Sequence, residues 1–204
     1  MYALGIVMMI ATMFIILSVA ILTPLYLKSV LAFTAIGAGL YMLPGNVLNI
    51  LMSPIVGSNF DKVGAKAFTR IGFSLITIAA ILFLVTVSAT TPVWQIVVIL
   101  CIFFLGVSMS IMPAQTNAMN ALPAKFYADG SAALNTLTQV AGAAGTAVAI
   151  TMFTAGQNKY IAEHGANEPL EFLAHGVNYA FIPVLVVAII GLICSIFVKN
   201  SRSE

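Results

Sequence analysis

Charged residues are scarce in this sequence. Asp, Glu, Lys and Arg make up only 7% of its 204 residues, whereas 61% are hydrophobic, and the mean hydropathy is +1.10. A soluble domain carries about 25% charged residues, so this composition excludes an ordinary water-soluble protein. The 14 charged residues, eight basic and six acidic, occur in short segments between long apolar runs.

Residues that carry enzymatic or metal chemistry are equally few. The two cysteines, Cys101 and Cys194, both lie inside apolar runs, where a single cysteine is usually a small packing residue. His164 and His175 have no cysteine or carboxylate at metal-ligand spacing. There is no nucleophile–base arrangement and no glycine-rich phosphate loop. We therefore predict neither an enzyme nor a metal or cofactor site, and a net charge of +2 without a basic stripe argues against nucleic-acid binding.

Six apolar runs are each long enough to cross a bilayer. A helix needs about 20 apolar residues for this, and the continuous runs do not alternate as barrel strands do. The sequence therefore predicts an all-α integral membrane protein, a bundle of six transmembrane helices in one domain over residues 1–204. The predicted spans are 4–26, 34–56, 67–88, 93–117, 130–155 and 175–198.

The basic residues between the spans predict an orientation. If both termini lie on one side, that side receives six basic residues and the other only Lys28 and Lys159. Basic residues concentrate on the cytoplasmic side, so both termini are predicted to be cytoplasmic, with a long external loop over about 156–174. The six are Lys62, Lys66, Arg70, Lys125, Lys199 and Arg202.

Three predicted spans each carry a polar face. Each amide could simply bond to a neighbouring helix, but three such faces together favour a water-accessible cavity. The faces are Met42, Asn46, Asn49 and Ser53 in the second span, Ser108, Met112, Gln115 and Met119 in the fourth, and Asn135, Thr138, Gln139, Gly142 and Thr146 in the fifth. The candidate cavity-lining residues are Met42, Asn46, Asn49, Met112, Gln115, Asn135 and Gln139.

Small residues recur every fourth position in the fifth span. Ala141, Gly145 and Ala149, with Gly142 beside them, predict a face on which another helix packs closely.

The centres of the spans contain no ionisable residue. Proton-coupled transport usually relies on an acid or histidine inside the membrane, but Asp61 falls in a predicted cytoplasmic loop and Asp129 at the cytoplasmic end of the fifth span. The sequence alone therefore offers no proton-coupling group.

The connection between the second and third spans contains a recognisable motif. The residues Gly57, Asp61, Lys62, Gly64 and Lys66 resemble, at the same spacing, the loop signature of the major facilitator superfamily. The alternative, a basic turn without further meaning, explains fewer of these positions. The resemblance implies that the motif is a conformational-switch loop.

Further segments resemble the second half of fourteen-span drug:proton antiporters of the EmrB/QacA type. They are Thr23–Leu27, Gly39–Pro44, Pro113, Leu122–Pro123 and Gln139–Gly145. In that family an arginine often precedes the glutamine, whereas Thr138 is present here.

The resemblance implies the C-terminal half of a multidrug efflux transporter in the plasma membrane, exporting small lipophilic, often cationic compounds. Such a chain would be incomplete without its N-terminal half, which would carry the buried acids. Its partners would be the lipid bilayer and that half, because pairing two copies of this chain would still supply no acid. The alternative is a stand-alone six-span scaffold or partner subunit without transport activity.

Overall fold

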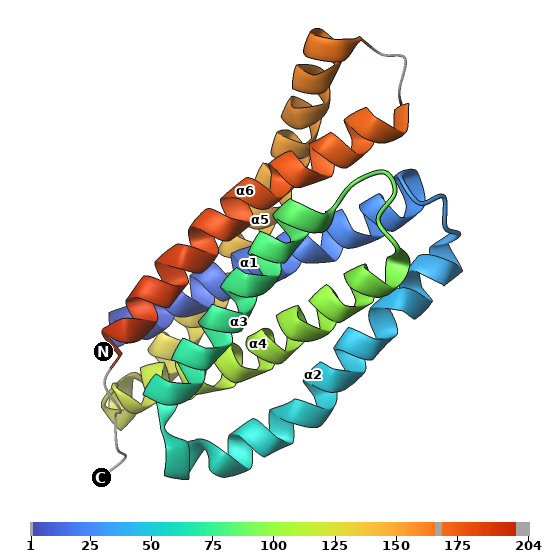
Figure 1. The fold of residues 1–204 in the computed structure, drawn as a ribbon. Coiled ribbons are helices and arrows are strands. Elements are labelled where there is room, and N and C mark those ends of the chain that lie inside the picture. The colour runs from blue at the N-terminus through green and yellow to red at the C-terminus, as the bar shows by residue number, and fades with distance from the viewer. Residues whose placement is uncertain (1, 166–168, 199–204) are drawn as a thin grey trace.

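The chain folds into six long helices (Figure 1). The computed structural model describes residues 2–165 and 169–198, apart from the side chain of Asp61. All six helices are long and apolar enough to cross a membrane, and the described residues contain no β-strand. The predicted all-α six-helix architecture is confirmed. The helices are α1 (Tyr2–Ser29), α2 (Ala35–Val63), α3 (Ala65–Thr86), α4 (Val93–Asn120), α5 (Tyr127–His164) and α6 (Pro169–Ile196), with a short 3₁₀ helix, η1 (Ala124–Phe126), before α5.

Several helices extend beyond the predicted spans, although α3 and α6 end two residues before the spans predicted for them. Helix α2 continues to Val63, so that only Gly64 separates it from α3, and the supposed loop motif lies mostly within helices. Similarly, α5 continues to His164 and α6 starts at Pro169, so most of the predicted external loop is helical. Hydropathy marks only the part of a helix that lies in hydrocarbon, whereas backbone hydrogen bonding continues past that boundary.

The bundle has two layers. Helix α2 packs on α4, α4 packs on α1, and α1 packs on α5, which gives one layer in the order α2–α4–α1–α5. Helices α3 and α6 contact each other and cover the back of this layer, α3 against α4 and α6 against α1 and α5. The front of the four-helix layer has no covering helix among the described residues, and α2 is the least buried helix.

Glycines allow the closest helix crossings. A Cβ atom built on Gly72 of α3 would lie 2.7 Å from the carbonyl oxygen of Gly106 on α4, and the reverse substitution gives the same distance to Gly72. On α5, a Cβ on Gly145 would lie 2.9 Å from the Cα of Phe14 on α1. The Ser18 hydroxyl donates a hydrogen bond to the Gly145 carbonyl across the same contact, at 3.0 Å. Small residues therefore fix α3 to α4 and α5 to α1.

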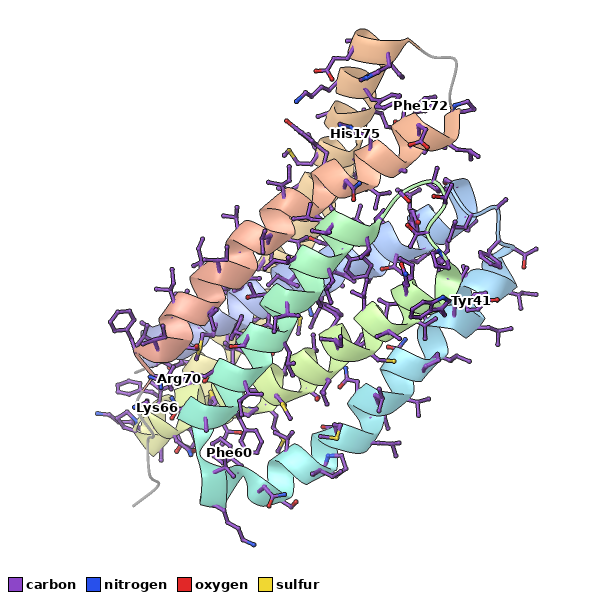
Figure 2. All side chains as sticks on the ribbon, viewed as in Figure 1. Tyr41, Phe60, Lys66, Arg70, Phe172 and His175 are labelled. Carbon is purple, nitrogen blue, oxygen red and sulfur yellow. The ribbon has the colours of Figure 1, made fainter. Side chains whose placement is uncertain are left out.

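Helices α5 and α6 project beyond the rest of the bundle at the end that carries His175 (Figures 1 and 2). Helix α5 has 38 residues, a length of about 57 Å, against a hydrocarbon core of about 30 Å. In this projection the rings of His164, Tyr160, His175 and Tyr179 form a column with centroid separations of 4.6, 5.5 and 6.2 Å. The His175 Nδ1 atom also lies 3.1 Å from the carbonyl oxygen of Gly156, which ties α6 to α5.

At the opposite end, Arg70 of α3 holds the last turn of α6 (Figure 2). Its Nη2 donates to the carbonyl oxygen of Ile196 at 2.8 Å, and its Nε donates to that of Ser195 at 3.4 Å. The last carbonyls of a helix lack partners in their own helix and carry its negative end. A guanidinium therefore satisfies two of them and also stabilises the helix dipole.

We expect Arg70→Ala to lower the free energy of unfolding by about 1 kcal/mol, because it removes charge-assisted hydrogen bonds from a partly exposed site. Thermal unfolding of the purified chain in micelles measures this. The stability of Arg70→Lys should lie between that of the unchanged chain and that of Arg70→Ala, since lysine keeps the charge but lacks the planar guanidinium group. Lys62→Ala, at an exposed position of the same end, is the control. Equal midpoints for Arg70→Ala and Lys62→Ala would remove Arg70 from this role.

Candidate functional site

The exposed side chains differ between the two layers. Between Ile71 and Val85 of α3, and between Ile182 and Ile196 of α6, every exposed side chain is aliphatic. The four-helix layer also exposes aliphatic side chains, such as Ile50 on α2 and Val140 on α5. In addition it carries amide side chains that are exposed or half-buried: Asn46 and Asn49 on α2, Gln115 on α4, and Asn135 and Gln139 on α5. We call these five residues the amide face.

This contrast separates lipid-facing surface from surface that meets something polar. Moving an amide without a hydrogen-bond partner from water into hydrocarbon costs about 4–8 kcal/mol. For this reason polar residues in membrane helices usually face the bundle interior or water. Aliphatic side chains carry no such cost. The exposed aliphatic side chains of α3 and α6 therefore suit contact with lipid, and the amides of the amide face suit contact with water or a protein partner.

Helix α2 brings part of its predicted polar face toward α4. Met42 is half-buried against the core, and the Asn46 amide donates to the Met42 carbonyl of its own helix at 3.0 Å. Asn49 is also half-buried, with Ser53 exposed one turn farther on. No interhelical hydrogen bond of Asn46 or Asn49 is seen among the described residues, so these amides remain able to contact a solute.

On α4 the predicted face divides into a buried and an exposed part. Ser108 is buried, and its hydroxyl donates to the carbonyl oxygen of Leu105 at 2.8 Å. Met112 is 41% exposed, and a Cβ on Gly57 of α2 would lie 3.1 Å from its Cε. Gln115, one turn later, is exposed. Met112 and Gln115 therefore belong to the surface, whereas Ser108 does not.

The predicted stripe on α5 also separates into two faces. Asn135 and Gln139 are exposed, but Thr138 is 6% exposed, and its hydroxyl donates to the carbonyl oxygens of Leu134 and Asn135. Thr138 thus packs into the bundle and gives the amide face no polar group. The small residues Ala141, Gly142, Gly145 and Ala149 are buried, and Gly142 and Gly145 lie against Leu17 and Phe14 of α1.

The motif at the Arg70 end is centred on Gly64. Its φ of 83° and ψ of 159° lie in a region that favours glycine, and its N–H donates to the carbonyl oxygen of Phe60 at 2.8 Å. Lys62 and Lys66 are exposed. Asp61 lies in the last turn of α2, and its side chain is outside the described structure. Gly57 is half-buried beside Met112, so the motif adjoins one end of the amide face.

Sequence reasoning overlooked the contribution of α1. Val7 and Leu17 are 40% and 36% exposed, so α1 adds an apolar strip between the amide-bearing helices. Because the sequence of α1 is apolar on every side of the helix, its hydrophobic periodicity could not distinguish the exposed side from the buried side. The Ser18 bond to Gly145 was also missed, although a lone serine in an apolar run is a signal of an interhelical contact.

Comparison with known proteins identifies the family. Residues 1–146 match the profile described as Major Facilitator Superfamily. The chain belongs to the major facilitator superfamily. It is therefore a multi-pass membrane protein of a transporter family and not an enzyme. The described residues contain no group of three or more His, Cys, Asp or Glu that could hold a metal ion.

Several members of the superfamily are similar to this chain. It is 43% identical to Lincomycin resistance protein LmrB of Listeria monocytogenes over 205 residues, which cover 99% of this chain and 43% of that relative. Identity to LmrB of Bacillus subtilis is also 43%, over 100% of this chain and 43% of the relative. Multidrug export protein EmrB of Haemophilus influenzae is 31% identical over 65% of this chain and 26% of its own length. The chain thus spans less than half the length of its LmrB relatives.

Proposed function

We propose that this chain is the C-terminal six-helix half of an EmrB/QacA-type multidrug exporter in the plasma membrane. In this proposal its termini face the cytoplasm, and its missing N-terminal half completes the transporter. The complete protein exports small lipophilic, often cationic compounds in exchange for protons. Relatives named for lincomycin resistance and multidrug export support this reading.

The observation that carries the proposal is the amide face. It is a broad surface with amides, methionine and aliphatic side chains, and with no ionisable residue near its centre. Apolar surface with a few polar groups is typical of small-molecule sites, and flexible methionine suits varied ligands. Covered by a second six-helix unit, this surface would form one wall of a central cavity in which alternating access takes place.

Proton coupling is assigned to the missing half. The Asp, Glu, Lys, Arg and His residues of the described helices all lie outside the helix centres, such as Lys28 on α1, Arg70 on α3 and Asp129 on α5. Proton-coupled transport relies on an ionisable residue within the membrane. The chain covers 43% of LmrB, which leaves room for a second bundle that supplies such a residue.

Expression in a drug-sensitive strain tests the proposal. Alone, the chain should give no drug resistance and no dye efflux. Co-expressed with the complementary N-terminal segment of an LmrB relative, it should restore efflux that an uncoupler abolishes. Clear efflux by the isolated chain, or none from the folded pair, would contradict the half-transporter assignment.

The same restored pair tests the motif. Asp61→Asn should reduce the efflux rate by roughly tenfold, a loss of about 1.4 kcal/mol in transition-state stabilisation, because the motif would no longer stabilise one end state. Asp129→Asn removes a carboxylate near the same end, outside the motif, and should leave the rate unchanged. Equal rates for the two variants would exclude Asp61 from the transport cycle.

A further inference from the structure

A pocket of about 380 Å³ lies at the His175 end of the bundle, away from the amide face. Its described lining comes from two segments that are distant in sequence. Ala89 and Thr90 belong to the connection between α3 and α4, and Pro169, Leu170 and Glu171 form the first turn of α6. In Figure 1 this connection faces the start of α6. Small-molecule sites usually have about 300–1,000 Å³, so the volume suits a compact ligand.

The lining combines apolar walls with a single charged group. Ala89, Pro169 and Leu170 supply hydrocarbon, and Leu170 is 47% exposed. Thr90 supplies a hydroxyl, 3.4 Å from that of Ser88. Glu171 is the only ionisable residue of the described lining, and it is exposed. Such a pocket suits a ligand that has an apolar body and a positive charge.

Helix α6 carries two side-chain acceptors on this side, one exposed in the pocket and one buried farther along the helix. Glu171 and Asn178 are seven residues apart and therefore lie on the same side of the helix. The Asn178 Nδ2 donates to the carbonyl oxygen of Val87 at 2.8 Å, but its Oδ1 is buried without a hydrogen-bond donor. Of these two acceptors only the exposed Glu171 carboxylate lines the pocket, where it favours a positively charged ligand and disfavours an anion.

We propose that this pocket binds an amphipathic organic ammonium ion, its apolar body against Leu170 and Pro169 and its charge beside Glu171. The site is formed by α6 and the α3–α4 connection, which contribute nothing to the amide face. It does not depend on the proposed transport, because binding alone defines it. The ammonium group could belong to a soluble compound or to a phospholipid headgroup, and the experiment distinguishes these sources.

The only tryptophan of the chain provides the measurement. Trp94 follows Thr90 by four residues and is 65% exposed, so it can transfer energy to a dansyl group bound nearby. The probe is a dansyl-labelled alkyl trimethylammonium, added to the purified 204-residue chain in micelles, with the matched dansyl alkyl sulfonate as the anionic control. We expect saturable energy transfer with the cation and weaker, non-saturable transfer with the sulfonate.

Two substitutions separate the charge of the pocket from its volume. Glu171→Gln should weaken cation binding by about threefold, as expected for an exposed ion pair, and should remove the effect of salt on binding. Glu163→Gln removes an exposed carboxylate of the same projection that does not line the pocket, and should bind as the unchanged chain does. Ala89→Phe should fill the pocket and weaken binding on the order of tenfold. Circular dichroism confirms that each variant is folded.

The outcomes decide both the site and the ligand source. Equal affinity of Glu171→Gln and Glu163→Gln, unchanged binding by Ala89→Phe, or equal binding of the sulfonate would overturn the proposal. In phosphatidylglycerol nanodiscs, added phosphatidylethanolamine should compete with the probe if a lipid headgroup is the ligand. If it does not compete, while the effects of Glu171→Gln and Ala89→Phe persist, the ligand is a soluble cation.

Discussion

Gln139→Glu should insert into the membrane and accumulate at nearly the level of the unchanged chain, whereas Ile78→Glu should accumulate at a small fraction of it. The two positions are comparable, because both side chains are exposed in the middle part of a membrane helix, Gln139 on α5 and Ile78 on α3. They differ in what they face. A carboxylate in lipid at the centre of a helix costs about 2.5–3.5 kcal/mol on insertion scales, but one in contact with water keeps most of its hydration.

The measurement is the amount of membrane-inserted, monodisperse protein for each variant, with Ile78→Leu as the control for substitution at that site. Asn135→Asp extends the test along α5 and should behave as Gln139→Glu does. If Gln139→Glu is lost as completely as Ile78→Glu, the amide face meets lipid, and the cavity wall has to be sought elsewhere.

Gly145→Ala should destabilise the bundle by about 1–3 kcal/mol, the usual cost of forcing a methyl group into a packed contact. The added Cβ would overlap the carbonyl oxygen of Phe14 and lie 2.9 Å from its Cα, and backbone atoms of a helix cannot rotate away. It would also separate Ser18 from the Gly145 carbonyl. The expected result is a lower unfolding temperature in micelles and a weaker α1–α5 contact.

Two other glycines provide matched controls. Gly39 of α2 has nothing within 4 Å of an added Cβ, so Gly39→Ala should leave stability unchanged or raise it by up to about 1 kcal/mol through helix propensity. A Cβ added at Gly142 would lie against the flexible side chain of Leu17, so the stability of Gly142→Ala should lie between that of Gly145→Ala and that of Gly39→Ala. If all three variants unfold at the same temperature, the α1–α5 contact is not fixed by backbone proximity at Gly145.

The number and type of the helices could be predicted from the sequence, because each membrane helix contains a long run of apolar residues. It could not assign the sides of those helices. Thr138 and Gln139 are neighbours in an amide-rich stretch, yet one packs into the bundle and the other is exposed. The difference depends on where α1 crosses α5, and that crossing is set by Phe14 against Gly145, 131 positions apart in the chain.

Helix ends were predicted less well than helix centres, for the same reason. The segment from Asp61 to Val63 is polar enough to read as a loop, but it completes the last turn of α2. Likewise the segment from Gln157 to His164 is too polar to continue the apolar run and was predicted as a loop, but it forms the end of α5. The small pocket beside Glu171 could not be foreseen, because its lining combines Ala89 and Leu170, which are 81 positions apart in the chain.

The single residue between α2 and α3 has a mechanical consequence. A connection of one glycine contains no slack, so α2 cannot tilt without turning about Gly64 or pulling on the first turn of α3. Helix α3 is in turn fixed through Arg70 to the last turn of α6. Any tilt of α2 would therefore have to pivot on the backbone of Gly64 and would also have to disturb the packing of α2 on α4.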